Sequence, residues 1–248
     1  MNRHIFPCRR VTTPAFGLAV MVALSVMATP PASAAGMDDM IFTHFEVEQL
    51  EYRVGDGSDI LAWDANGWIG NDDHRLAFKT EGENPVGKRL EQAEFQFLYR
   101  RPVSEFFDVN VGVRHDLRPD PDRTYAVLGI QGLAKQFVHT DANLFISETG
   151  DVSARLEIET EWLLTQRLHL VPSAELNVAF SEDAAIESGA GINKLELGLR
   201  LQYEVTREFA PYIGLHWERK FGATANHARE EGGDADNLYA LAGIKFWF

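Results

Sequence analysis

The 248-residue chain contains a single cysteine, Cys8, and this residue lies within a predicted signal peptide covering residues 1–34. A basic start, a short apolar run and a small-residue cleavage site together indicate such a leader. These features are Arg3, Arg9 and Arg10, then residues 15–29, then Ala32-Ser33-Ala34. We therefore expect an exported mature chain that has no cysteine and no disulfide.

Long hydrophobic runs are also missing after the leader. No later segment approaches the ~18 consecutive apolar residues that a membrane-spanning helix requires. Only helices and closed barrels satisfy every backbone polar group in lipid. If the mature chain enters a membrane, we therefore expect a barrel.

Positive charge is scarce. The chain has 23 Lys and Arg against 37 Asp and Glu, for a formal charge of −14. Removal of the leader takes away three arginines and no acid, so the charge becomes about −17. Nucleic-acid affinity comes largely from Lys and Arg on phosphate, so nucleic acid is not an expected partner. An acidic balance suits a surface or lumen that attracts cations.

Catalytic signatures are lacking as well. The sequence has no G-x-S-x-G, no P-loop and no dinucleotide fingerprint. Ser173 and His169 share one face of a predicted strand but sit four residues apart, roughly 13 Å at the rise of a strand. That separation is too long for proton transfer, so we do not expect an enzyme.

Strict alternation of apolar and polar residues is the dominant pattern of the sequence after the leader, and residues 195–217 show it best. Leucines at 195, 197, 199 and 201 alternate with Glu196, Gly198, Arg200 and Gln202. Strands of ten or more residues are long for a soluble sheet and match tilted transmembrane strands. The same pattern predicts about twelve strands, near 42–54, 60–69, 75–81, 90–100, 107–116, 124–133, 137–147, 152–162, 167–180, 195–205, 209–217 and 238–248. A slip of parity near Gln49 predicts a bulge in the first strand.

The connections alternate between mostly longer loops and short turns, which is typical of outer-membrane barrels. The last strand ends on Phe248, an aromatic terminus that resembles the barrel recognition signal. Aromatic residues at strand ends, Trp68 among them, predict an interfacial girdle. The sequence thus predicts an all-β fold, an antiparallel transmembrane barrel of the outer membrane over residues 42–248, preceded by a short periplasmic segment, 35–41. The alternative is a secreted β-sandwich, whose strands should be shorter.

The parity that faces the lumen is dense in charge, including Arg155, Glu157, Glu159, Glu161, Arg200 and Glu204. A polar barrel interior can be a cross-linked Arg–Glu network that fills or narrows the lumen. It can also be an acidic path for cations, because rings of Asp and Glu favour cations in pores. The sequence leaves both interpretations open.

Three stretches, residues 163–180, 194–222 and the closing Ile-Lys-Phe-Trp-Phe, resemble the copper resistance protein B family of Gram-negative outer membranes. The resemblance extends from about Met40 to the C-terminus. It implies a role in copper resistance and homeostasis, by binding copper ions or assisting their export. The partners it implies are copper ions, outer-membrane lipid and a periplasmic copper-handling protein.

The chain departs from the family in one respect, because the Met- and His-rich segment of many members is nearly absent here. Met37 and Met40 are the only methionines after the leader. Met37, Met40 and His44 are one candidate copper site, at the periplasmic mouth. His169 and His216 are a second, on the lumen face. Thioether suits Cu(I) and imidazole suits Cu(II), so the oxidation state stays open. The alternative function is a general diffusion pore for small cationic solutes.

Overall fold

The structure, a computed structural model, describes residues 40–248 except 56–57, 184–185, 187 and 231–232. The predicted signal peptide and Met37 lie outside the described residues. The strands are β1 (Phe42–Gly55), β2 (Ile60–Gly70), β3 (Arg75–Pro85), β4 (Gln92–Pro102), β5 (Phe107–Arg118), β6 (Arg123–Ala134), β7 (Val138–Ser147), β8 (Val152–Thr160), β9 (Trp162–Leu163), β10 (Leu168–Ala179), β11 (Gly191–Tyr203), β12 (Phe209–Lys220) and β13 (Asp236–Trp247).

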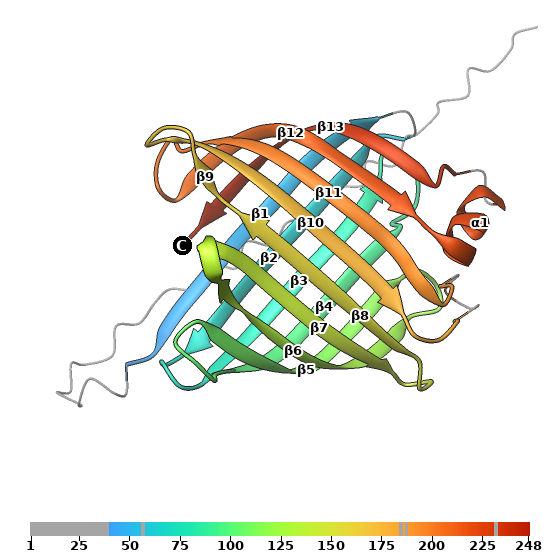
Figure 1. Cartoon of the computed structure of the whole chain (residues 1–248), viewed down its shortest axis with the longest axis horizontal. Helices are drawn as coiled ribbons and strands as arrows, with labels where there is room; N and C mark the ends of the chain where they lie inside the picture. The colour runs from blue at the N-terminus through green and yellow to red at the C-terminus, as the bar shows by residue number, and fades with distance from the viewer. Residues whose placement is uncertain (1–39, 56–57, 184–185, 187, 231–232) are drawn as a thin grey trace, which may run out of the picture. The chain divides into compact units, whose positions relative to one another are not determined.

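Neighbouring strands pair antiparallel around a closed ring (Figure 1). β13 pairs with β1, and β10 pairs with both β8 and β11, so no long strand is left with an unpaired edge. The two-residue β9 continues β8 after an interruption at Glu161 and pairs with β10 in the same register. Within the described residues the barrel therefore has twelve strands, and the predicted fold is confirmed.

Side chains alternate between lumen and outer surface, as the pleat of a strand requires. On β11, Leu199 is 42% exposed whereas its neighbour Arg200 is 3% exposed. Phe97, Leu128 and Ile213 are likewise exposed on the outside of their strands. The outer surface thus carries an apolar band suited to lipid, while the charged residues turn inward.

The two ends of the barrel differ in the length of their connections. At one end, the short-turn end, brief turns join β2 to β3, β4 to β5, β6 to β7, β9 to β10 and β11 to β12, and the C-terminus lies there (Figure 1). The opposite end carries the longest connections, including the one that contains helix α1 (Gly222–Glu230). This arrangement matches the alternation predicted from the sequence. In the described part of the chain, no helix is long and apolar enough to cross a membrane.

The last residue closes the seam between β1 and β13. The backbone N–H of Phe248 donates to the carbonyl of Phe45 at 2.9 Å, and the N–H of Phe45 donates to the carbonyl of Phe248 at 3.2 Å. The register of β1 shifts between Val47 and Gln49 against β2, which confirms the predicted bulge. The bulge lets Glu46, Glu51 and Arg53 all face the lumen despite their different parities.

Two sequence-based details are corrected. β3 ends at Pro85 and not at residue 81, because Pro85 pairs with Ile60 of β2 and Glu83 pairs with Gln92 of β4. Trp68 does not belong to the outer girdle, because its ring lines the internal cavity. The guanidinium of Arg75 lies over this ring, 4.8 Å from its centroid.

Candidate functional site

A cavity of about 470 Å³ lies inside the barrel, and its walls are strongly acidic. Among the described residues, twelve Asp and Glu side chains line it against six Lys and Arg. The excess follows from the sequence pattern, which places acids on the lumen parity of nearly every strand. A wall of one sign in a confined space raises the local concentration of counter-ions, here cations.

Part of this charge is neutralised by an ion-pair network centred on Glu51, which is fully buried. The carboxylate of Glu51 accepts hydrogen bonds from Nε of Arg200 at 2.6 Å and from Nε of Arg53 at 2.8 Å. The hydroxyl of Tyr212 donates to it at 3.1 Å. Arg53 also donates to Glu83 at 2.6 Å. These bonds compensate the desolvation of the buried charges.

A second network is centred on Glu94, which is 1% exposed. Arg155 Nη2 donates to Glu94 at 2.9 Å, and Arg114 Nη2 lies 2.8 Å from the same oxygen. Arg114 also forms a bidentate pair with Asp116. The guanidinium of Arg114 lies over the ring of Phe145, 4.6 Å from its centroid. The predicted Arg–Glu network is therefore present in the lumen.

Some of these pairs cross the lumen. Arg155 on β8 reaches Glu94 on β4 and Glu81 on β3, which lie four and five strands away around the ring. Lys79 on β3 pairs with Asp141 on β7. Because the partners stand on walls far apart around the ring, their side chains occupy the space between them. The lumen is therefore narrowed by charged side chains.

Other carboxylates of the cavity lie outside these ion-pair networks. Within the described residues, Glu48, Asp64 and Glu159 form no ion pair with Lys or Arg, although all three line the cavity. Glu48 accepts one hydrogen bond, from the amide of Asn66 at 2.8 Å. Their carboxylate oxygens are available as ligands to a cation that enters the lumen.

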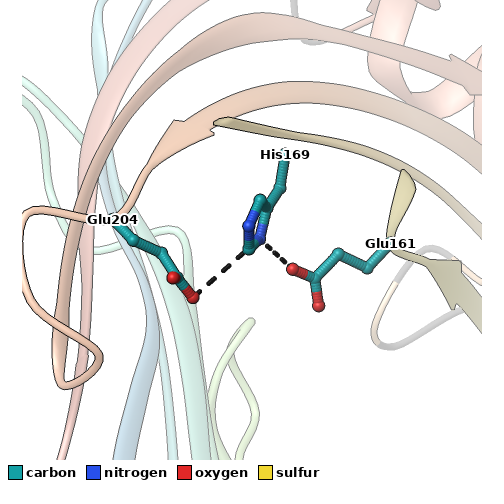
Figure 2. Close-up of side chains that lie close together, drawn as sticks. All are labelled: Glu161, His169 and Glu204. Carbon is teal, nitrogen blue, oxygen red and sulfur yellow. Dashed lines mark ion pairs between the residues drawn. The ribbon is translucent and has the colours of Figure 1, made fainter. Parts of the chain in front are cut away.

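At the short-turn end, three side chains meet on adjacent strands (Figure 2). Glu161 lies at the interruption between β8 and β9, His169 near the start of β10, and Glu204 directly after β11. His169 pairs with Leu163 on one side and Gln202 on the other. Glu161 is two residues from Leu163, and Glu204 is two residues from Gln202. Both acids are therefore diagonal neighbours of His169 on the lumen face. We call these three residues the mouth cluster.

Within the mouth cluster, the imidazole projects between the two carboxylates (Figure 2). Nδ1 of His169 contacts Glu161 in a close ion pair and lies 3.9 Å from Oε1 of Glu204. One ligand atom from each residue lies within 4.8 Å of the others. The His169 side chain is 7% exposed, whereas the side chains of Glu161 and Glu204 are 48% and 33% exposed. Nitrogen and oxygen donors so placed can hold a metal ion.

The structure does not bring the two predicted lumen histidines together. His169 pairs with Gln202 and His216 pairs with Gly198, so they lie four residues apart along β11, roughly 13 Å at the rise of a strand. His216 has different neighbours: Glu196 at 3.2 Å and the guanidinium of Arg53 at 3.4 Å. A cation beside the ring nitrogen opposes a metal ion at that atom.

The other predicted copper ligands are only partly described. Met40 is 55% exposed at the start of the described chain, and Met37 lies outside the described residues. His44 is half-buried, with Nε2 3.4 Å from Glu46 and its ring between those of Trp68 and Trp247. The structure therefore describes no joint site for Met37, Met40 and His44.

Sequence reasoning placed Glu161 and Glu204 in the lumen but did not join them to His169. The signal that could have found Glu161 is the short turn at residues 164–167, which joins β9 to β10; counting outward from it puts Glu161 diagonal to His169. β10 and β11 are joined by the longer connection at the opposite end of the barrel, so no short turn in the sequence sets Glu204 beside His169.

Among solved structures, the chain is similar to the NanC porin, with a TM-score of 0.51 at 14% sequence identity, covering 82% of this chain and 98% of that one. At this identity the likeness concerns the fold alone.

Sequence comparison is more specific. A protein from Pseudomonas syringae pv. tomato, named copper resistance protein B homolog, is 40% identical over 211 residues, covering 85% of this chain and 71% of its own length. Copper resistance protein B of Escherichia coli is 41% identical over 202 residues, covering 82% and 68%. The family model described as copper resistance protein B precursor (CopB) matches residues 41–248. The chain therefore belongs to the copper resistance protein B family.

Proposed function

We propose that this protein lies in the outer membrane and contributes to copper resistance by binding copper ions and assisting their passage through its acidic lumen. Family membership supports the role in copper resistance. The outward apolar band and the closed ring of twelve strands support a membrane position. The signal peptide expected over residues 1–34 would supply the export that this position requires.

The observation that carries the proposal is the excess of carboxylates on the cavity wall, twelve against six basic groups. Copper ions are cations, and such a wall lowers the free energy of a cation inside a narrow passage. The unpaired Glu48, Asp64 and Glu159 provide successive weak stops. The function is non-catalytic in this proposal, and a periplasmic copper-handling protein would deliver or receive the ion at the short-turn end.

The second candidate is a general diffusion pore for small cationic solutes. The acidic wall favours cations in both cases, but a diffusion pore needs an open passage. The pairs of Arg155 with Glu81 and Glu94, and of Lys79 with Asp141, stand across the lumen and oppose free flow of solutes. We therefore favour copper handling.

Growth of a strain that lacks the gene tests this choice. We expect the deletion strain to tolerate less copper than its parent, and we expect a plasmid copy of the gene to restore tolerance. Sensitivity to unrelated cationic solutes should not change. Unaltered copper tolerance, together with reduced uptake of small cations in general, would favour the diffusion pore.

A further inference from the structure

We propose that the mouth cluster, Glu161, His169 and Glu204, is a binding site for divalent copper at the short-turn end of the barrel. The identity of the metal rests on the proposed function, whereas the site itself rests on geometry. Three consecutive strands of the barrel wall bring the three side chains to one point on the lumen face.

The donor set suits a divalent ion. One imidazole nitrogen and two carboxylate oxygens are ligands for Cu(II) and Zn(II), whereas Cu(I) prefers sulfur. The described part of the chain contains one methionine, Met40, and no cysteine. Ligand atoms of a metal lie about 2.0–2.2 Å from it. A spread of no more than 4.8 Å among the three atoms therefore needs only small side-chain rotations to close around an ion.

His169 gives the site a fixed anchor. Its ring is buried, projects between the carboxylates (Figure 2), and is held by the backbone pairing of β10 on both sides. Its Nε2 atom is buried and has no hydrogen-bond partner among the described residues. Buried imidazole nitrogens are normally paired, so among the described residues the ring makes its polar contacts through Nδ1, the nitrogen that faces the two carboxylates. An ion bound at Nδ1 would take the place of the direct contact between this nitrogen and Glu161.

The charge and the solvent exposure of the mouth cluster also favour a bound cation. Within the described residues, no Lys or Arg forms an ion pair with Glu161 or Glu204, unlike the situation at His216, where Arg53 lies 3.4 Å from the ring. The two carboxylates are part-exposed, so an ion from solution can reach them. Glu159 follows on the same face of the same wall and lines the cavity. An ion held at the mouth therefore has an unpaired carboxylate next on the way inward.

The test is titration of the refolded, purified mature protein with Cu(II), with electron paramagnetic resonance to report nitrogen coordination. We expect one Cu(II) with an imidazole nitrogen and carboxylate oxygens in the wild type. His169→Ala and the isosteric double variant Glu161→Gln/Glu204→Gln should bind more than tenfold more weakly. His74→Ala is the matched control, because His74 is an exposed histidine in the short turn between β2 and β3, at the same end of the barrel, and does not line the cavity; it should bind as the wild type does. Buffered Cu(I), used as a second probe, should bind equally to the wild type and to His169→Ala.

Heat-modifiable gel mobility confirms that each variant is folded, and the double glutamine variant keeps the shape of the cluster if His169→Ala fails to fold. Wild-type Cu(II) binding in both variants, or equal loss in His74→Ala, would overturn the site. The growth assay of the deletion strain distinguishes failure of this site from failure of the proposed function. If deletion sensitises cells to copper while both variants bind Cu(II) normally, the site is wrong and the function stands. If deletion leaves copper tolerance unchanged, the function is wrong, and Cu(II) and Zn(II) titrations still decide whether the site exists.

Discussion

Glu51 shows how single residues hold this interior together. Its side chain is fully buried, yet it keeps three partners, the two guanidinium groups of Arg53 and Arg200 and the hydroxyl of Tyr212. A buried ion pair is not stabilising in itself, but removal of one partner leaves the opposite charge buried and unpaired. Glu51 neutralises two arginines that have been drawn out of water, so its loss should be costly.

We therefore predict that Glu51→Gln lowers the free energy of unfolding by about 3 kcal/mol or more. The amide keeps the shape and one acceptor oxygen but removes the charge that Arg53 and Arg200 require. Urea unfolding of the refolded barrel in lipid vesicles measures the change. Glu105→Gln, in an exposed turn, is the control and should stay within about 0.5 kcal/mol of the wild type. Equal stability of the two variants would show that the Glu51 network does not stabilise the barrel.

At the scale of elements, alternation predicted the strands and, apart from Trp68 on β2, which side chains face the lumen. Leu199 and Arg200 fall on opposite sides of β11 as their parity requires, because a pleated strand leaves no other choice. The predicted ends of the strands were less accurate. β3 continues to Pro85 because the neighbouring strands β2 and β4 offer it partners, and this information is not local to its own sequence.

The candidate site was predictable only in part, because the pairing between strands is not encoded within the sequence of any one strand. Parity placed His169 and His216 in the lumen, but distance along the wall depends on register, which separates them. Contacts across the lumen could not be predicted from the sequence. Arg155 and Glu94 are 61 residues apart in the chain, and only the diameter and closure of the ring bring them together.

The assignment of the Leu199 face of β11 to the lipid can be tested by mutation. Leu199→Arg places a charge on the apolar band, and we predict a cost of about 2–4 kcal/mol if the position lies near the middle of the bilayer. The measurement is the fraction of heat-modifiable, folded protein after refolding into vesicles, which should fall. Leu199→Met, which keeps volume and polarity, should fold as the wild type does. Normal assembly of Leu199→Arg would mean that this face does not contact lipid.

At the scale of the whole molecule, the pairs that cross the lumen should limit the flow of ions. Arg155 contacts Glu81 and Glu94, which stand five and four strands away around the ring, so its truncation removes both a steric obstacle and a positive charge. We predict low conductance for the wild type in planar bilayers. Arg155→Ala should conduct several-fold more and prefer cations more strongly, because the carboxylates it neutralises are released.

Arg101→Ala serves as the control for this measurement, because Arg101 is exposed and forms no ion pair among the residues that the structure describes. Its conductance should equal that of the wild type. A wild-type conductance as large as that of an open porin would contradict the obstruction. So would an Arg155→Ala variant that is folded and conducts no better than the wild type.

The closed ring of backbone hydrogen bonds has a further consequence for the charges it encloses. Because the wall is continuous, an ion can advance only if side chains change partners while the strands stay in place. Immobile carboxylates in excess over immobile bases, on a rigid support, are the composition of a cation-exchange resin. A resin holds its ions loosely, exchanges them by mass action, and releases them in strong salt. Copper held by the lumen wall alone should therefore wash out with sodium chloride, whereas copper coordinated by His169 should remain.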